Sequence, residues 1–384
     1  MSNRALLIKG YEKAIAAVKA ESIIPKNLSV DEKNLIVCNK KYPLESFNKL
    51  YCFSVGKAGF EMAKVCEEVL GEHLDGGVAI SHQKGSLNKM NHYRSTHPLV
   101  SKKSLKVTQK LISNMETLEE DDFFVFCLSG GASAMIEKPV YGLSLDDFQK
   151  VSVALLGSGI DIKALNSVRK AISQVKGGKL ASHTKARGVV LVLSDVIGDD
   201  LKTIGSAPMR NGQIPHHVIA NNSIALEKAK KFMAKEVDKV EIVTTTLNKA
   251  SKKATEYLVE EIRKYDKKYD SFVLLFGGET TTKVKGSGQG GRNQELALRL
   301  LLEEVVSKNI SILVAGSDGI DGNSPATGAF LDVGIYKEMK KQGLNPKEYL
   351  KNSDSYGFFK QLGYDFTIGA TSTNVMDFIM VLKK

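Results

Sequence analysis

The segment Phe123-Phe124-Val125-Phe126-Cys127-Leu128-Ser129-Gly130-Gly131-Ala132-Ser133 places an unbroken apolar run directly before a loop of small residues. An apolar run of this length, bounded by turn-forming residues, predicts a β-strand buried on both faces. Similar runs recur at residues 51–55, 77–81, 188–193, 217–220, 240–244, 272–276 and 310–315. Helical patterns lie at 4–20, 58–70, 101–114, 145–156, 162–171, 223–234, 250–265 and 293–308. This alternation predicts an α/β fold in which helices cover both faces of parallel sheets.

The chain has 384 residues, which is more than one hydrophobic core usually organises. We therefore expect two three-layer α/β/α domains. The Pro/Gly-rich stretch 205–215 separates two α/β series, so we place the domains at residues 1–208 and 209–384. Ligands of open α/β sheets bind outside the carboxyl ends of the strands, and nearly all glycine and acidic loops of this chain follow strands. We expect these loops to converge on a cleft between the domains.

The net charge is +11, yet the lysines are spread along amphipathic helices rather than gathered in a basic arm. This distribution argues against nucleic acid as a partner and is typical of a solvated surface. The four cysteines are scattered without a C-x-x-C pair, so the sequence indicates neither a zinc site nor a disulfide framework. Without a signal-peptide pattern or an apolar run of membrane-spanning length, we expect a cytoplasmic protein with no membrane partner. A homodimer is an assembly that the sequence leaves open.

Two glycine loops follow predicted strands near the start of the chain. Lys57 follows Gly56 at the start of a helix, where a lysine can reach into a phosphate site; a solvent-exposed lysine is the plain alternative. The loop Ser129-Gly130-Gly131-Ala132-Ser133 offers backbone N–H groups and two hydroxyls to a nucleotide phosphate. A tight turn would need glycine, but not two glycines and two serines. We favour phosphate binding for this loop.

A third loop, residues 286–291, satisfies the dinucleotide pattern G-x-G-x-x-G with Gly286, Gly288 and Gly291. A dehydrogenase would also need a carboxylate about twenty residues later, at the end of the next strand. The acids near that spacing, Glu303 and Glu304, fall within the predicted helix 293–308. The neighbouring charges of Lys283, Lys285 and Arg292 suit more phosphate than a pyrophosphate carries, and no Walker A ending is present.

Acidic residues follow two other predicted strands. Asp195, Asp199 and Asp200 come after the run at 188–193, and Asp318 and Asp321 come after the run at 310–315. A single carboxylate at a strand end is usually a turn residue. Two such clusters beside phosphate loops favour Mg²⁺ coordination or activation of a hydroxyl group.

These motifs occur together in an order that resembles one family. The ordered motifs are residues 54–58, 128–134, 166–170, 176–181, 194–200, 277–281, 290–295, 317–322 and 371–377. They resemble the class II glycerate kinases, that is, the glycerate 2-kinase family whose C-terminal half is called the MOFRL domain; here that region spans about residues 270–380. The resemblance covers nearly the whole chain. It implies a Rossmann-like N-terminal parallel sheet, a C-terminal α/β domain and phosphorylation of D-glycerate at its 2-hydroxyl with ATP and a divalent metal.

The resemblance also assigns roles to residues. Lys57 and Arg292 match the positions proposed as a catalytic basic pair, and Asp195 and Asp318 match acidic positions in the same cleft. Our working hypothesis is in-line phosphoryl transfer with Asp195 as proton acceptor or metal ligand. ATP is expected on Ser129, Gly130, Gly131, Ala132, Ser133, Gly288, Gly290 and Gly291. The acceptor is expected on Lys57, Arg292, Asn293 and Glu279, and Mg²⁺ on Asp318 and Asp321.

The sequence departs from the family pattern in a shorter stretch after Pro208, in the lack of a glycine-glutamate pair near residues 249–253, and at three single positions. Ala132 replaces the third glycine of the S-G-G-G-S loop, Ala171 replaces the histidine after Arg-Lys, and Ala207 replaces the glycine of an S-G-P turn. Two alternatives therefore stay open. One is an NAD(P)-dependent hydroxypyruvate reductase that uses the loop at 286–291. The other is a degenerate relative that binds a nucleotide without turnover or acts on another hydroxy acid.

Overall fold

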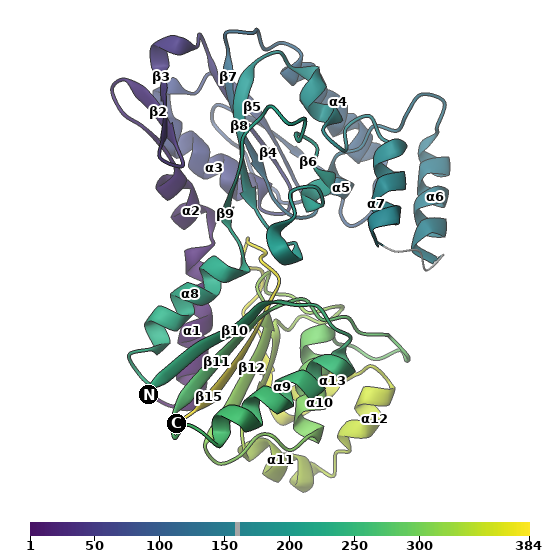
Figure 1. The fold of residues 1–384 in the computed structure, drawn as a ribbon. Helices are drawn as coiled ribbons and strands as arrows, with labels where there is room; N and C mark the ends of the chain where they lie inside the picture. Colours follow the sequence, from purple (N-terminus) through teal and green to yellow (C-terminus); the bar gives the residue numbers. More distant parts are fainter. Residues whose placement is uncertain (158–161) are drawn as a thin grey trace. The chain divides into compact units, whose positions relative to one another are not determined.

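The computed structural model describes residues 1–157 and 162–384, which divide into two compact units (Figure 1). Unit 2 is Lys19–Ala220, and unit 1 combines Met1–Val18 with Asn221–Lys384. This division differs from the predicted boundary at residue 208. Strand β9 (His216–Ala220) pairs in parallel with β8 (Arg187–Leu193), so the segment after 208 still belongs to the first sheet. Helix α1 (Asn3–Ala17) packs on α8 (Asn222–Met233), which places the N-terminus in the other unit.

The main sheet of unit 2 is entirely parallel, as predicted. Its strands are β4 (Leu50–Val55), β5 (Gly76–Ser81), β6 (Asn91–Arg94), β7 (Phe123–Leu128), β8 and β9. Their spatial order is β6-β5-β4-β7-β8-β9. If β4 is counted as the first strand, this is the 3-2-1-4-5-6 order of a doubly wound sheet. The strand order reverses between β4 and β7, the first and fourth strands. The loops after β4 and β7 therefore meet at the topological switch point, where such sheets bind ligands.

Helices cover both faces of this sheet because its central strands are apolar on both sides. Helix α4 (Lys102–Met115) buries Leu111 and Ile112 in a core with Phe53, Phe124 and Phe126. Helix α3 (Gly59–Leu70) packs on β4, β5 and β7 at the other face. There the sulfur atoms of Cys52, Cys66 and Cys127 lie within 4.8 Å of one another, all fully buried. Their wide spacing in the sequence gave no sign of this cluster.

Smaller elements complete unit 2. Helix α2 (Ala20–Asn27) packs on α3, and β1 (Leu28–Val30), β2 (Asn34–Val37) and β3 (Lys40–Pro43) form a separate antiparallel sheet. The sequence patterns did not predict α2 or these short strands. Helix α5 (Ala132–Met135) follows the glycine loop after β7. Helices α6 (Leu145–Gly157) and α7 (Ile162–Ala171) pack against each other, in agreement with the predicted helical segments.

The sheet of unit 1 is mixed, so the prediction of a parallel sheet is wrong for this half. The order is β10 (Lys239–Leu247), β11 (Phe272–Gly278), β15 (Asp377–Lys383), β12 (Ile310–Gly316), β13 (Gly328–Leu331) and β14 (Asp365–Phe366). Only β10 and β11 pair in parallel. The last strand, β15, inserts antiparallel between β11 and β12 and is buried along Asp377–Leu382. The C-terminus therefore supplies a central strand of this sheet.

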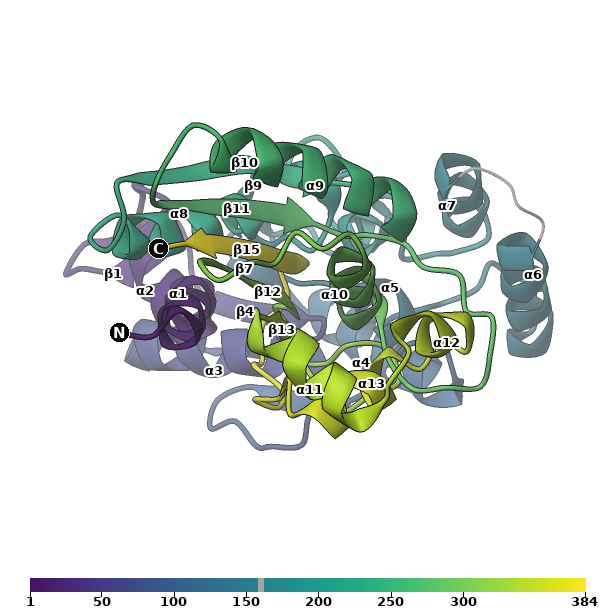
Figure 2. The same cartoon turned by 90° about the horizontal axis from the view of Figure 1, so that it is seen from below.

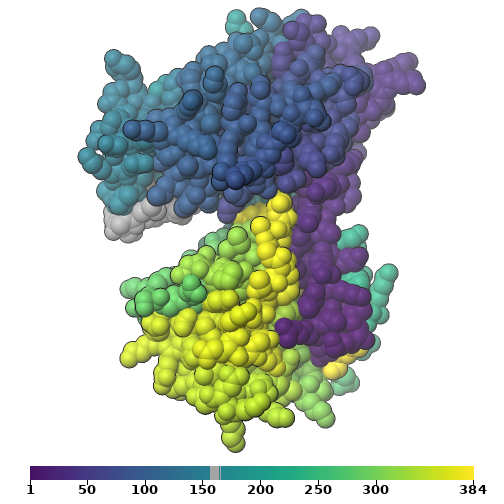
Figure 3. Space-filling view, turned by 180° about the vertical axis from the view of Figure 1, so that it is seen from behind, coloured from purple at the N-terminus to yellow at the C-terminus, as the bar shows by residue number. Residues whose placement is uncertain are grey.

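Unit 1 has three layers (Figure 2). Helices α1 and α8 lie together on one face of the sheet, where α1 contacts β12 and β15 and α8 contacts β10 and β11. The opposite face carries α9 (Ser251–Asp266) and α10 (Arg292–Leu302), with α11 (Gly334–Gln342), α12 (Pro346–Lys351) and α13 (Ser355–Leu362) beside them. Figure 3 shows the N-terminal helix alongside the C-terminal segment, where the Thr373 hydroxyl donates to the Val18 carbonyl over 2.8 Å.

Candidate functional site

The loops after β4 and β7 are bonded to each other at the switch point of unit 2. The Lys57 backbone N–H donates to the Gly130 carbonyl at 2.8 Å, and the Ala58 N–H donates to the Ser129 hydroxyl at 3.1 Å. The Ser129 N–H donates in turn to the Val55 carbonyl at 3.0 Å. These bonds fix the backbone on which Lys57 is mounted. They also show what Ser129 does: it is 1% exposed, and its hydroxyl holds the two loops together instead of facing solvent.

Close approaches across this cluster require glycine at two positions. A Cβ atom on Gly130 would lie 1.8 Å from Oδ2 of Asp195, so this carboxylate rests against the loop. Gly131 has φ +80°, and a Cβ there would lie 3.0 Å from Cγ of Lys57 and 2.9 Å from Cδ2 of His97. The structure thus brings together Lys57, Asp195 and the glycine loop, which the sequence analysis selected separately. It adds His97, to which the sequence gave no role; burial and the charge of Lys57 lower the pKa of His97 to about 4.

The helix after the loop differs from the expected phosphate-binding helix. Helix α5 has only four residues, Ala132–Met135, so it adds little dipole to the loop. Ala132 is fully buried and belongs to the apolar core of unit 2. Its methyl group thus fills core space, which explains how alanine replaces the glycine of the family pattern.

Of the acids Asp199 and Asp200, the second has a structural role in a turn. Asp200 accepts from the Lys202 N–H and the Thr203 hydroxyl, both at 2.9 Å, and is exposed. These bonds lower the pKa of Asp200. It is therefore a turn residue, as the alternative reading of strand-end carboxylates anticipated.

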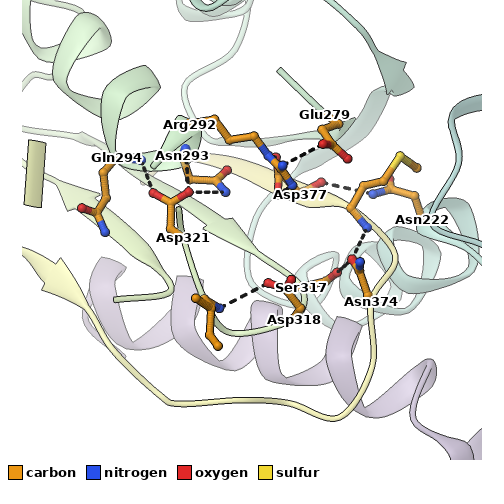
Figure 4. Close-up of polar contacts among 12 residues, drawn as sticks. Asn222, Glu279, Arg292, Asn293, Gln294, Ser317, Asp318, Asp321, Asn374 and Asp377 are labelled. Atoms are coloured by element: carbon orange, nitrogen blue, oxygen red, sulfur yellow. Dashed lines mark hydrogen bonds and ion pairs between the residues drawn. The ribbon is translucent and has the colours of Figure 1, made fainter. Parts of the chain in front are cut away.

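A second cluster lies at the strand ends of unit 1, around Arg292 at the start of α10 (Figure 4). The guanidinium donates to both oxygens of Asp377, from Nε at 2.6 Å and from Nη2 at 3.0 Å. Its Nη1 donates to Glu279 at 2.7 Å. Burial alone would lower the pKa of Arg292, but the Asp377 and Glu279 carboxylates outweigh it and raise the pKa. Asp377 is the partner that the sequence analysis missed, since it treated that residue only as part of the last motif.

Asp321 acts as a helix cap. Its carboxylate accepts from the N–H groups of Asn293 at 3.1 Å and Gln294 at 2.8 Å, and from the Asn293 side chain at 3.2 Å. Asp321 is only 1% exposed, and burial raises its pKa to about 7 against the effect of these bonds. Its bonding is thus explained without a metal. The metal roles of Asp318 and Asp321 stay predictions.

Asp318 lies half-buried in the loop after β12, against the last family motif. The Thr371 N–H donates to the Asp318 carbonyl at 3.2 Å, and the Val375 N–H donates to the Ser317 hydroxyl at 2.7 Å. Among residues 1–157 and 162–384, the cysteine cluster is the only group of three or more possible metal ligands at metal-binding separation. Asp318 therefore does not belong to a cluster of three or more His, Cys, Asp or Glu ligands in the described part of the chain.

A cavity of about 460 Å³ opens beside Arg292 in unit 1. Its lining includes the predicted residues Glu279, Gly288, Gly290, Gly291 and Arg292. The glycines also meet packing requirements, because a Cβ on Gly290 would lie 2.1 Å from the Ser355 hydroxyl and one on Gly288 would lie 2.3 Å from Cβ of Asp354. Asn293 faces Asp321 instead of the cavity, and it is 2% exposed.

The G-x-G-x-x-G loop does not have the setting of a dinucleotide fingerprint. Residues 279–291 separate β11 from α10, where a Rossmann turn joins strand and helix directly. Strand β15 lies between β11 and β12 and runs antiparallel to both. Glu303 and Glu304 also lie beyond the end of α10, which is shorter than predicted, and precede β12. Neither acid is at the end of the following strand.

Comparison with known proteins places these two clusters in one family. A model described as a domain of unknown function, DUF4147, matches residues 6–240, and the MOFRL family model matches residues 272–377. A D-glycerate 2-kinase from Thermotoga maritima is 34% identical, with 88% of this chain and 92% of that protein covered. The chain belongs to the class II glycerate kinase (MOFRL) family.

Other members of the family agree over the whole chain. A glycerate 2-kinase from Pyrococcus horikoshii is 30% identical, with 100% of this chain and 98% of that protein covered. The crystal structure of a glycerate kinase from Thermotoga maritima has a TM-score of 0.88 at 32% identity and covers 99% of each chain. No helix in the described part of this chain has both the length and the apolar character that crossing a bilayer requires.

The sequence analysis assigned no role to two further members of the site, of which Glu137 lies in none of the motifs and Lys176 begins the motif 176–181. Glu137 and Lys176 form a buried ion pair beside the glycine loop of unit 2, at 0% and 3% exposure. The Ser173 hydroxyl donates to the other oxygen of Glu137 at 2.5 Å. The family motifs at 166–170 and 176–181 thus build the surroundings of the loop. The convergence of the Lys57 and Arg292 clusters on one cleft stays a prediction.

Proposed function

We propose that this chain transfers the γ-phosphoryl group of ATP to the 2-hydroxyl of D-glycerate. The observation that carries the proposal is the assembly of Lys57, Asp195 and the Ser129–Ser133 loop at the switch point of a doubly wound sheet, in a chain with glycerate kinases as full-length relatives. A phosphoryl transferase works mainly by positioning and by electrostatic stabilisation. The hydrogen-bonded glycine loop can position the phosphates, and the Lys57 ammonium can stabilise their negative charge.

The proposed step is an in-line displacement. The 2-hydroxyl oxygen forms a bond to the γ-phosphorus as the bond from that phosphorus to the bridging oxygen of ADP breaks. Asp195 accepts the hydroxyl proton, and Lys57 stabilises charge on the transferring group. Asp195 is suited to this because its carboxylate is half-buried and lies directly on Gly130 of the loop.

Arg292 binds the carboxylate of the acceptor in this proposal. Its bonds to Asp377 and Glu279 use three of the five N–H groups that a guanidinium carries. The side chain is 33% exposed and lines the cavity of unit 1, so its outer edge is accessible. Asp377 fixes the plane of the guanidinium, which makes Arg292 a pre-oriented donor for a planar carboxylate.

Of the two predicted Mg²⁺ ligands, Asp318 fits the ion better than Asp321. Asp318 would hold it together with nucleotide phosphate oxygens, since Mg²⁺ commonly takes one or two carboxylates and completes its shell with phosphates and water. When bound, Mg²⁺ offsets negative charge on those oxygens. Asp321 remains the cap of α10.

The direct test is ADP release from ATP and Mg²⁺ with a panel of D-glycerate, L-glycerate, hydroxypyruvate, tartronate and erythronate. We expect turnover with D-glycerate and a product whose phosphorus resonance is that of 2-phosphoglycerate. Phosphorylation at the 3-hydroxyl, or preference for another acceptor, would contradict the finer assignment. Oxidation of NADH or NADPH by hydroxypyruvate without ADP release would favour the reductase, and nucleotide binding without turnover would favour a degenerate relative.

A further inference from the structure

Unit 2 holds a second cavity, of about 270 Å³, that the catalytic proposal does not use. Its walls are mostly apolar and include Leu99, Phe148 and Val153. Leu99 is 70% exposed and Val153 is 66% exposed, so both side chains are accessible from solvent. Arg169 of α7 and Lys176 add polar groups to the lining. An apolar slot with a few fixed polar groups is the usual form of a small-molecule site.

The cavity is continuous with the glycine loop. Ser133, the last residue of the loop, and His97 both line it. His97 also borders Gly131, where a Cβ would lie 2.9 Å from its ring, and the same Cβ would lie 3.0 Å from Cγ of Lys57. One end of a ligand in the cavity would therefore lie near the glycine loop and Lys57. His97 would lie between the ligand and Lys57.

Buried bonds make the polar side of the cavity rigid. Lys176 is paired with Glu137, which also accepts from Ser173 at 2.5 Å, while the Glu137 N–H donates to the Thr108 hydroxyl at 2.8 Å. The Lys176 ammonium lies 5.8 Å from the centre of the Phe148 ring. Because Glu137 neutralises Lys176, the positive charge in this lining comes from Arg169. The wall is thus preformed by buried bonds, and it carries the charge of Arg169 beside its apolar surfaces.

We propose that this cavity binds the base and ribose of the phosphoryl donor, with the phosphates directed along Ser133 toward Lys57; this rests on the proposed kinase function. A purine nucleoside needs an apolar slot with an aromatic wall, and Phe148 and Val153 provide one. Glycerate is too small and too polar to use such walls. The cavity of unit 1 is a poorer match, because the carboxylates Glu279 and Glu295 are part of its lining.

The chain has no tryptophan, so a single introduced indole reports on one cavity at a time. Val153→Trp places a reporter in this cavity, and Val284→Trp places a matched reporter in the cavity of unit 1, at a valine that is 72% exposed. Each variant is titrated with adenosine, with ADP and with inorganic triphosphate. We expect adenosine and ADP to change the indole emission of Val153→Trp saturably, and inorganic triphosphate to leave that emission unchanged. Adenosine should leave the indole emission of Val284→Trp unchanged.

A kinetic pair complements the binding assay. Leu99→Ala should raise KM for ATP by about tenfold, the effect of losing one apolar wall contact, while kcat and KM for glycerate stay the same. Val333→Ala, at a 46% exposed valine that lines neither cavity, should change neither KM. Because both side chains are exposed, neither truncation should unfold the protein.

The outcomes separate this inference from the proposed function. A response to adenosine at Val284→Trp alone, or at neither variant, in an enzyme that phosphorylates glycerate would overturn the inference and keep the function. A saturable response at Val153→Trp in a protein that shows no ATP-dependent turnover would support the nucleoside cavity and contradict the kinase. A response of Val153→Trp to triphosphate equal to that with adenosine would also overturn the assignment, since the cavity would then bind phosphate.

Discussion

The two basic residues with predicted catalytic roles are held in different ways. Lys57 stands on a frame of backbone bonds, in which its own N–H donates to Gly130 and the next N–H donates to Ser129. Arg292 is held through its side chain, by Asp377 and Glu279, beside an α10 start capped by Asp321. A backbone frame tolerates loss of the side chain, whereas a carboxylate frame left without its cation keeps buried negative charge. Equivalent substitutions should therefore have different consequences for folding.

The largest expected effect is that of Arg292→Ala. It removes the proposed acceptor contact, so kcat/KM for glycerate should fall by about a hundredfold or more. It also leaves Asp377, which is 2% exposed, without its partner, and should lower the free energy of unfolding by about 3 kcal/mol. Steady-state kinetics and urea unfolding measure the two losses.

The destabilisation of Arg292→Ala has a definite pH dependence. Burial already raises the pKa of Asp377 in the presence of Arg292, and the pKa should rise further without it. A raised folded-state pKa gives stability at low pH that is lost as pH rises. The deficit relative to the parent protein should therefore shrink on acidification. A deficit independent of pH would contradict the carboxylate frame, and Arg299→Ala on the same helix serves as a control for general loss of an α10 ion pair.

Lys57→Ala should reduce kcat by about a hundredfold as well, because the charge on the transferring group loses its stabilisation. Its free energy of unfolding should stay within about 0.5 kcal/mol of the parent, since the bonds of the frame come from the backbone. Lys64→Ala, at an exposed position of α3, is the matched control and should leave both quantities unchanged. Full activity in Lys57→Ala would remove Lys57 from the mechanism.

Gly130→Ala tests the backbone frame from within. The new methyl group would lie 1.8 Å from Oδ2 of Asp195 and must displace that carboxylate. If Asp195 is the proton acceptor, kcat should fall by about tenfold or more, with a smaller change in KM for ATP. Gly142→Ala at φ +82°, where nothing lies within 4 Å of the added Cβ, controls for replacement of a glycine in unit 2. Equal kcat values for Gly130→Ala and the parent would argue against Asp195 as the base.

The sequence predicted local elements better than their pairing. The runs 123–128 and 162–171 became β7 and α7 without change, because each depends on its own apolar pattern. The segment Asp377–Lys383 is just as apolar, yet its place between β11 and β12 depends on partners about 65 to 105 residues away and has no local signal. The mixed sheet of unit 1 was missed for this reason.

The candidate site shows the same limit. Motif order selected Lys57, Asp195 and Arg292, and the structure places each beside other family motifs. The supporting partners were missed, because a lone carboxylate such as Asp377 or Glu137 has no spacing that marks it. Asp321 is predicted to be a metal ligand because strand-end acids suit both metals and helix caps, and its three bonds to Asn293 and Gln294, which show the cap, could not be predicted from the sequence.

The cap at Asp321 should make the stability of the protein depend on pH. Its folded-state pKa of about 7 lies above the value of about 3.9 in an unfolded chain, so its contribution is complete in acid and disappears as pH rises through 7. From about pH 6 to about pH 8 the free energy of unfolding should lose about 1.4 kcal/mol from this group. Asp321→Asn should abolish that part of the slope. Asp200→Asn should not, because its carboxylate has a lowered pKa and is ionised throughout this range.

The smallest expected effect concerns Ala207, which stands where the family has a glycine. Ala207 adopts φ 55° and ψ 53°, a left-handed conformation that costs a residue with a Cβ roughly 1–2 kcal/mol. Its carbonyl accepts from the Gly178 N–H at 2.7 Å, so the strained turn is bonded to the motif at 176–181. Ala207→Gly relieves the strain but makes the unfolded chain more flexible, which offsets about 0.4–1 kcal/mol. We expect a net gain of about 0.5 kcal/mol in urea unfolding with unchanged kcat, and a loss of stability would mean that the buried methyl group contributes more by packing than the turn costs.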